Sequence, residues 1–204
     1  MIRLGISVEG KTERNFVSTV LKPHLEQFGV TVVASPMHGN ISLDRVKHEL
    51  KSFVHGFDHV STFYDYYKFV RAKGRTVSEL ETAMLEGLEQ SLKSKITPYI
   101  QMYEFEALLF AVPDKVTELL RGKEKQTNLM RDAVKECGSP EAVNKEFDTK
   151  PSARLGRIFP GYENQKDLYG AQILREAGLA TVREGCPRFS VWITQLEQLG
   201  QQAA

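Results

Sequence analysis

The chain has 204 residues, of which 41% are hydrophobic and 26% are charged, and its formal net charge is +1. This composition is ordinary for a globular domain that buries its own core, and so small a net charge excludes a chain whose overall field holds nucleic acid unaided. The two cysteines, Cys137 and Cys186, are far apart and lack metal-ligand spacing, which argues against a disulfide framework and against a structural zinc site.

Strand-like and helix-like patterns alternate over the first hundred residues. Residues 2–8 alternate apolar and polar side chains and predict a strand. The charged residues that follow it at once exclude a signal peptide or a membrane span here, so we expect a cytoplasmic protein without a membrane partner. Residues 12–27 have apolar side chains at helical spacing, with Pro23 expected to kink or tighten the helix and Gly29 to end it.

The same alternation continues to residue 103. Residues 30–34, 60–66 and 99–103 predict three further strands, a helix is expected from an N-cap at Ser42 onward, and residues 78–92 predict a long amphipathic helix. This order predicts a mostly parallel four-stranded sheet with helices on both faces.

The pattern turns helical from about Pro113 onward. Pro140, directly after Ser139, is a helix start signal, and Trp192 with Phe189 and Leu196 is expected in the core. We therefore predict an α/β core over residues 1–112 and a helical extension over residues 113–204 that packs on it. The expected helices are residues 114–120, 128–136, 139–147, 168–177 and 190–199, with residues 149–166 irregular and basic.

Acidic residues follow three of the predicted strands. Glu9 comes after the first strand, Asp65 closes the third, and Glu104 with Glu106 follows the fourth. Because binding groups of a parallel sheet gather beyond the carboxyl ends of its strands, these four residues predict one carboxylate-lined site for Mg²⁺ or Mn²⁺.

Most of these acids also have a structural explanation. Thr12 and Glu13 can satisfy backbone donors at the start of the first helix, although such capping explains Glu9 less well. Asp65 can simply terminate its strand, and Glu104 and Glu106 can stabilise a helix N-terminus.

A basic segment is the second candidate for chemistry. Arginine and lysine suit phosphate oxygens, and Tyr162 could stack on a base; a solvated charged face is the alternative. Walker spacing is absent, so we do not expect this chain itself to hydrolyse ATP. The predicted phosphate-binding residues are Lys150, Arg154, Arg157 and Lys166.

Glu9 and Asp65, each after its strand, resemble the Toprim fold of topoisomerases, primases and overcoming-lysogenization-defect (OLD) nucleases. The chain departs from that pattern at Tyr67, which stands where the Toprim motif has a second aspartate. It is more similar to a bacterial, Toprim-related family known only as a domain of unknown function. The stretches that carry this resemblance are residues 65–67, 104–110, 150–152, 159–162 with Lys166, and 186–189 before Trp192.

The resemblance implies a divalent-metal-dependent nuclease. Asp65 would hold the metal, Glu104 or Glu106 would replace the missing aspartate, and Glu9 would be a further ligand or the general base. It also implies an ABC- or AAA-type ATPase partner encoded nearby in a bacterial defence locus. Two alternatives stay open: a non-catalytic regulatory or docking subunit, which Tyr67 favours, and a phosphotransfer or nucleotide-binding enzyme.

Overall fold

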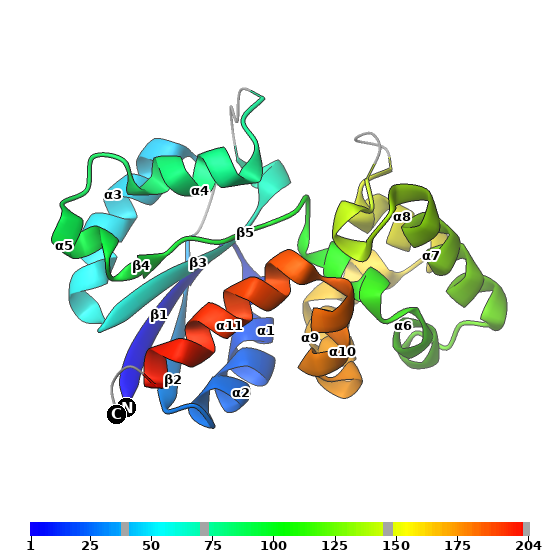
Figure 1. Ribbon diagram of the computed structural model, residues 1–204. Helices are drawn as coiled ribbons and strands as arrows, with labels where there is room; N and C mark the ends of the chain where they lie inside the picture. Colours follow the sequence, from blue (N-terminus) through cyan, green and yellow to red (C-terminus); the bar gives the residue numbers. More distant parts are fainter. Residues whose placement is uncertain (38–40, 70–73, 145–148, 202–204) are drawn as a thin grey trace. The chain divides into compact units, whose positions relative to one another are not determined.

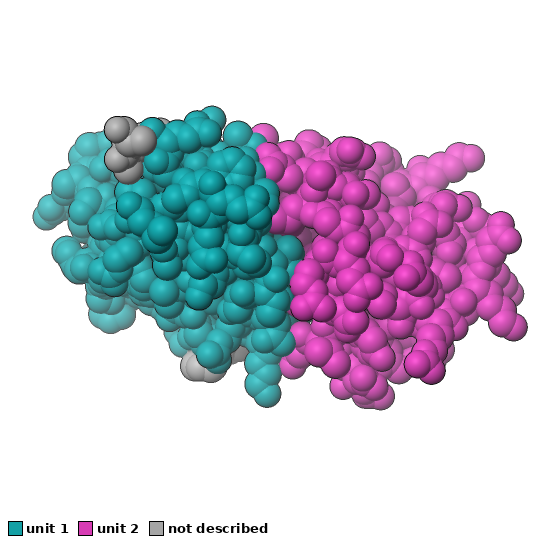
Figure 2. Space-filling model, turned by 90° about the horizontal axis from the view of Figure 1, so that it is seen from below, with its two compact units in different colours: residues 1–101, 192–204 teal, residues 102–191 magenta. Residues whose placement is uncertain are grey.

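The computed structural model describes residues 1–37, 41–69, 74–144 and 149–201 (Figure 1). Packing divides the chain into two compact units, shown in separate colours in Figure 2. The sheet unit comprises residues 1–101 and 192–204, and the helical unit comprises residues 102–191. The boundary near the C-terminus falls inside the last helix, α11 (Pro187–Gln201), whereas the sequence pattern had suggested a single boundary between residues 112 and 113.

The sheet unit is built on parallel strands. Its three long strands are β1 (Ile2–Val8), β2 (Val30–Pro36) and β3 (His59–Asp65), and two short strands follow, β4 (Ile96–Thr97) and β5 (Ile100–Gln101). The strand order is β2-β1-β3-β4, with β5 also paired to β3, and every pairing is parallel. The predicted Toprim-like α/β fold class is confirmed.

The predicted fourth strand, residues 99–103, is wrong in its extent. Pro98 has no N–H to give to a ladder, and it lies between β4 and β5. The hydroxyl of Thr62 on β3 fills this gap, because it accepts a hydrogen bond from the Tyr99 N–H and donates one to the Tyr99 carbonyl, both at 2.8 Å. Within the expected range only β5 forms, and β4 precedes that range.

The first helical segment is continuous but not uniform. It runs through α1 (Lys11–Phe16), a π-helical turn η1 (Val17–Leu21) and α2 (Lys22–Glu26). Pro23 cannot donate to the carbonyl four residues before it, and the chain widens into the π-turn directly ahead of it. The sequence predicts a kink or a tightened turn near Pro23, whereas the structure has a widened π-turn just before it. Gly29, with φ of 78°, then reverses the chain into β2.

The predicted helix at residues 78–92 is wrong as a single element. It is interrupted between α4 (Val77–Leu85) and α5 (Gln90–Lys93). Gly87 has a φ of 75° there, a left-handed conformation that ends helices and that glycine adopts without steric cost.

The predicted N-cap is confirmed, since Ser42 Oγ accepts a hydrogen bond from the Arg45 N–H at 3.4 Å at the start of α3 (Leu43–Phe53).

Trp192 anchors the core of the sheet unit from α11. Its ring stacks on Tyr99, with centroids 4.4 Å apart, and on Phe63, at 5.2 Å. Its indole N–H donates a hydrogen bond to Ser61 Oγ at 2.9 Å. The prediction that Trp192, Phe189 and Leu196 are core residues is confirmed, because all three are buried.

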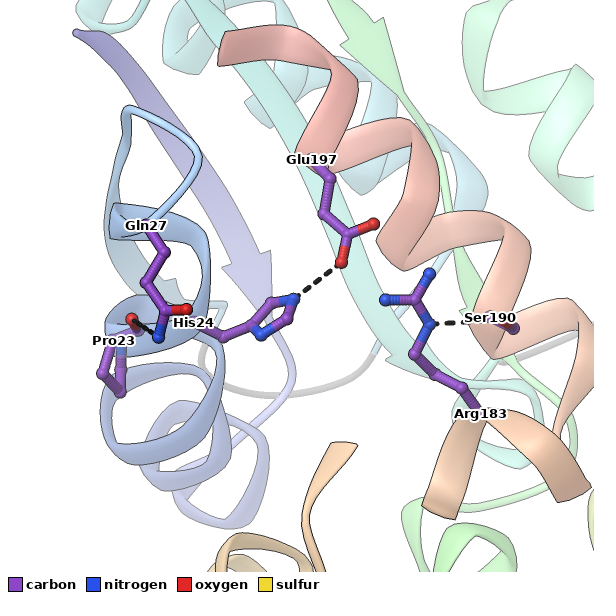
Figure 3. Close-up of polar contacts among 6 residues, drawn as sticks. All are labelled: Pro23, His24, Gln27, Arg183, Ser190 and Glu197. Atoms are coloured by element: carbon purple, nitrogen blue, oxygen red, sulfur yellow. Dashed lines mark hydrogen bonds and ion pairs between the residues drawn. The ribbon is translucent and has the colours of Figure 1, made fainter. Parts of the chain in front are cut away.

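The same helix contacts α2 through a polar pair. His24 Nε2 lies 2.7 Å from Glu197 Oε1, and both side chains are mostly buried (Figure 3). Further along α11, a Cβ on Gly200 would overlap the carbonyl group of Phe28, so only glycine permits this approach. These contacts tie the C-terminal part of α11 to the sheet unit.

The helical unit confirms the predicted helical second half. Its elements are η4 (Phe105–Ala111), α6 (Pro113–Leu119), α7 (Glu124–Cys137), η5 (Pro140–Ala142), α8 (Pro151–Ile158), η7 (Tyr162–Gln165), α9 (Lys166–Ala177), α10 (Leu179–Gly185) and the start of α11. None of the helices in the described part of the chain is long and apolar enough to cross a membrane.

Two predictions for this unit are wrong. Residues 149–166, expected to be irregular, contain α8, which begins with Pro151 at its first position. A helix over residues 139–147 is not found: after Ser139, whose hydroxyl accepts from the Ala142 N–H, only the short turn η5 forms. Residues 145–148 of that prediction lie outside the described residues.

Candidate functional site

Glu9 and Asp65 lie at the carboxyl ends of neighbouring parallel strands in the sheet unit. The register pairs Val8 of β1 with Phe63 of β3, so Glu9 follows one strand while Asp65 ends the other at the same edge. Both side chains are buried or nearly so, with Asp65 6% exposed and the Glu9 side chain 16% exposed. The sequence-based placement of these two acids at one sheet edge is therefore reproduced in the structure.

The Glu9 carboxylate is incompletely satisfied. Its Oε1 atom lies 3.0 Å from Lys68 Nζ, whereas its buried Oε2 atom has no hydrogen-bond partner in the described part of the chain. A buried carboxylate oxygen without a partner is unfavourable unless a cation or a donor approaches it. Mg²⁺ and Mn²⁺ prefer carboxylate oxygens, so the donor set at this edge fits a divalent metal ion.

Lys68 is the residue of this edge that sequence reasoning missed. It belongs to η3 (Tyr66–Lys68), the turn that follows Asp65 directly. Tyr67, which stands in place of the second Toprim aspartate, is in the same turn. The available signal was a lysine three residues after Asp65, a candidate metal ligand. Only the folded turn shows that the Lys68 ammonium reaches Glu9.

The turn after Glu9 confirms the capping role considered for Glu13. Glu13 Oε2 accepts a hydrogen bond from the Gly10 N–H at 2.9 Å and thereby closes the start of α1. Glu13 is only 5% exposed. Its position is thus explained by the helix start, whereas no comparable cap explains Glu9.

Glu104 is held tightly inside the helical unit. Its Oε1 atom lies 3.0 Å from Lys150 Nζ, and its Oε2 atom accepts a hydrogen bond from the Ser152 N–H at 2.9 Å. Ser152 is in the first turn of α8, so Glu104 satisfies a backbone donor there and places negative charge at the positive end of the helix dipole. Glu106, in η4, is also buried, with 4% exposure.

The predicted phosphate-binding cations are mostly engaged with acids. Arg154 donates to Glu136 Oε2 at 3.1 Å and to the Thr149 carbonyl at 2.8 Å. Arg157 is exposed and has no ion pair with a described residue.

Lys166 is the fourth of these cations, and its Nζ lies 3.4 Å from Glu163 Oε2. Burial alone would lower the pKa of Lys166, but the negative charges of Glu106 and Glu163 outweigh it, so that the pKa is raised above the usual lysine value. Lys166 is therefore a permanent cation beside Glu106 within the helical unit.

A further buried acid, Glu141, was not predicted. Its two oxygens accept hydrogen bonds from the Arg188 N–H at 2.9 Å and the Phe189 N–H at 3.0 Å, at the start of α11. Burial raises the pKa of Glu141, although these two bonds oppose the shift. Glu141 lies 47 and 48 positions away in sequence from these two partners, so no local pattern could have predicted the contact.

The structure places the four predicted metal ligands in two units. Glu9 and Asp65 belong to the sheet unit, and Glu104 and Glu106 belong to the helical unit. Among the residues that the structure describes, no three histidine, cysteine or acidic side chains gather in a group that could hold a metal ion. That all four acids form one site stays a prediction.

The parallel sheet with its helices defines a Toprim-like α/β protein. The chain belongs to the family described as domain of unknown function (DUF4276), which it matches over residues 8–197. Comparison with curated proteins found no match.

Solved structures with a similar fold are C-terminal regions of OLD proteins. The region from Burkholderia pseudomallei has 18% sequence identity and a TM-score of 0.54, covering 100% of this chain and 98% of that chain. The region from Xanthomonas campestris pv. campestris has 17% identity and a TM-score of 0.51, covering 98% and 96%. At these identities the similarity establishes the fold.

Proposed function

We propose that this protein is a divalent-metal-dependent nuclease that hydrolyses phosphodiester bonds, with Glu9 and Asp65 as metal ligands. The observation that carries the proposal is the buried Glu9 Oε2 atom without a described partner, at the same sheet edge as Asp65. Mg²⁺ commonly binds through one or two carboxylates together with water and substrate phosphate, so two acids suffice to hold it.

Each residue at this edge has a role in the proposed reaction. Asp65 holds the ion, and Glu9 either adds a ligand or takes a proton from the attacking water. The bound ion would lower the pKa of a water and offset charge on the phosphate. Because the Lys68 side chain is 57% exposed, it can turn from Glu9 toward a substrate phosphate.

Residues of the helical unit complete the proposal. Arg157 is the best placed of the predicted phosphate ligands, since it is exposed and has no described ion-pair partner. Lys150, Arg154 and Lys166 would have to exchange a carboxylate for a phosphate. Glu104 and Glu106 remain proposed as additional metal ligands.

The proposal includes an ATPase partner and a role in bacterial defence, in the cytoplasm. Its support is the resemblance to OLD nucleases, together with a net charge of +1 that gives the chain little long-range attraction for nucleic acid. A partner that delivers the substrate would supply what the charge does not. The similar solved regions are themselves C-terminal parts of longer proteins.

The test is cleavage of plasmid, single-stranded DNA and total RNA by the purified chain, alone and with any ATPase encoded beside it. Mg²⁺, Mn²⁺ and EDTA are compared for the wild type and for Glu9→Gln, Asp65→Asn, Glu104→Gln and Glu106→Gln. Exposed Glu26→Gln is the matched control. We expect metal-dependent cleavage that Glu9→Gln and Asp65→Asn each reduce by at least about a hundredfold. Cleavage that survives both changes would refute the site.

A non-catalytic docking subunit is the second candidate, and two observations favour it. Tyr67 replaces a metal ligand of the Toprim pattern, and the Lys68 ammonium already offsets part of the negative charge of Glu9. This alternative predicts stable ATPase binding with no cleavage under any metal condition, so the same assay separates the two functions.

A further inference from the structure

The helical unit contains a pocket of about 320 Å³ at the ends of α6 and α8. Its volume is at the lower end of the roughly 300–1,000 Å³ typical of small-molecule sites, which suits one nucleotide better than a dinucleotide cofactor. The pocket contains none of the four acids of the proposed metal site. The residues that carry the argument are Arg121, Gln126, Phe159, Tyr162, Gln165 and Tyr169.

Close packing fixes the wall of the pocket. Arg121 has a φ of 53°, unusual for a residue with a side chain, and the next residue, Gly122, donates its N–H to the Thr117 carbonyl at 2.8 Å. A Cβ on Gly122 would lie 2.6 Å from the Phe159 ring, so the turn and the ring are pressed together. Strained backbone that the surrounding packing enforces is a recurrent feature of ligand sites.

Three aromatic rings give the pocket an apolar, planar character. Phe159 and Tyr162 are buried, while Tyr169 is partly exposed. Aromatic side chains stack on nucleobases with little sequence preference, so these rings suit the face of a base.

The polar groups of the lining have spare hydrogen-bonding capacity. The side chains of Arg121, Gln165 and Tyr169 make no hydrogen bond to the described residues, and Gln126 uses only its Oε1 atom, which accepts from the Lys123 N–H at 2.9 Å. Glutamine amides pair with base edges, and an arginine fork pairs with phosphate. Among the described residues no acid lines the pocket and Arg121 is its one charged side chain, so the pocket favours an anion.

We propose that this pocket binds one nucleotide, with the base against the aromatic wall and the phosphate on Arg121. The nucleotide is either a free mononucleotide or one unstacked residue of a single strand, since both present the same chemistry. The inference goes beyond the proposed nuclease function, because binding here requires neither the metal-site carboxylates nor cleavage.

The test is isothermal titration calorimetry on the full chain in EDTA. The probes are AMP, adenosine, inorganic phosphate, a short single-stranded oligoadenylate and the corresponding duplex. We expect Arg121→Gln to weaken AMP about tenfold and to leave adenosine unchanged, because only the phosphate contact is lost. Tyr169→Leu weakens both AMP and adenosine about tenfold, because it removes stacking. Exposed Arg175→Gln, with the same charge change in the same unit, has no effect.

The outcomes separate the sources and the two proposals. AMP binding without oligonucleotide binding identifies a free nucleotide, and oligonucleotide binding that AMP displaces identifies a strand; both support the pocket. Three outcomes overturn the pocket proposal. They are no binding of AMP or of the oligonucleotide, inorganic phosphate binding as tightly as AMP, and AMP affinity that is unchanged in Arg121→Gln and Tyr169→Leu. Glu9→Gln combined with Asp65→Asn should abolish cleavage and retain AMP binding, so failure of the nuclease proposal is distinct from failure of the pocket.

Discussion

The Lys68 ammonium lies 3.0 Å from Glu9 Oε1, where β1 ends in the sheet unit. Because the Lys68 side chain is 57% exposed, this ion pair adds little to the stability of the fold. Its consequence is electrostatic: a cation on Glu9 opposes the approach of a second cation. Lys68 therefore competes with any metal ion that Glu9 binds.

Replacing Lys68 with glutamine should strengthen metal binding. We expect Lys68→Gln to raise the affinity for Mn²⁺ about threefold to tenfold, because it removes a repelling charge from the ligand sphere. Electron paramagnetic resonance of free Mn²⁺ measures this directly, with exposed Lys51→Gln as the control. A weaker affinity in Lys68→Gln would mean that Lys68 positions Glu9 rather than competing at it.

Glu104 should contribute to stability whether or not it binds a metal. Glu104→Gln removes the charge that faces Lys150 while it keeps an acceptor for the Ser152 N–H. Because Lys150, whose side chain is 26% exposed, then loses this counter-charge, we expect the free energy of unfolding to fall by about 1–3 kcal/mol in urea denaturation.

The matched control for Glu104→Gln is Glu163→Gln. Glu163 also pairs with a lysine, Lys166, but the Glu163 side chain is 51% exposed. It should change stability by less than about 0.5 kcal/mol. Unchanged stability in Glu104→Gln, together with lost cleavage, would contradict the structural role and assign Glu104 to the chemistry.

Local patterns were enough to predict much of the sheet unit. The ends of β1 and β3, and with them Glu9 and Asp65, follow from apolar runs that charged residues terminate, and Ser42 marks its helix start by residue type alone. These features depend on neighbours in sequence, which is why single-sequence reasoning found them.

What the sequence could not reveal depends on contacts between distant residues. The break at Pro98 is compensated by the Thr62 hydroxyl from another strand, and Lys150 is neutralised by Glu104 before α8 begins. Prolines and cations in residues 149–166 indicated a loop, but Pro151 occupies the first helical position, where it is tolerated. The prediction that four acids form one metal site likewise needs tertiary information that a strand pattern does not contain.

Trp192 should be among the most sensitive positions of the sheet unit. Trp192→Phe loses the hydrogen bond to Ser61 Oγ and leaves a cavity beside Tyr99. We expect a loss of about 2–3 kcal/mol in the free energy of unfolding, measured by circular dichroism in urea. Val33→Thr, on a side chain that is 49% exposed, is the control and should cost far less. A near-neutral Trp192→Phe would show that the core adjusts around a smaller ring.

The contact between His24 and Glu197 should be measurable as a coupling between α2 and α11 (Figure 3). His24→Gln, Glu197→Gln and the double variant form a double-mutant cycle. We expect a coupling free energy of about 0.5–1.5 kcal/mol, because the 2.7 Å contact is mostly shielded from solvent. Additive effects of the two substitutions would show that this pair does not couple α2 to α11.

His59 should make the fold less stable in mild acid. Burial lowers the pKa of His59 from 6.5 to about 4 at the start of β3, where its ring nitrogen Nε2 lies 2.8 Å from Thr97 Oγ1. Below pH 6.5 the unfolded chain takes up a proton at His59, whereas the folded chain does not until about pH 4. Above pH 6.5 His59 therefore does not destabilise the fold. As the pH falls from 6.5 to 4 it lowers the free energy of unfolding progressively, and below pH 4 this loss stays constant.

His59→Gln should remove this part of the pH dependence. Allowing for the partial exposure of the ring, we expect the wild type to lose about 1–2 kcal/mol more than the variant between pH 6.5 and pH 4. Urea denaturation across this range measures the difference, with exposed His55→Gln as the control. The His55→Gln control should follow the wild type. Parallel curves for His59→Gln and the wild type would mean that His59 is solvated and protonates in the folded chain.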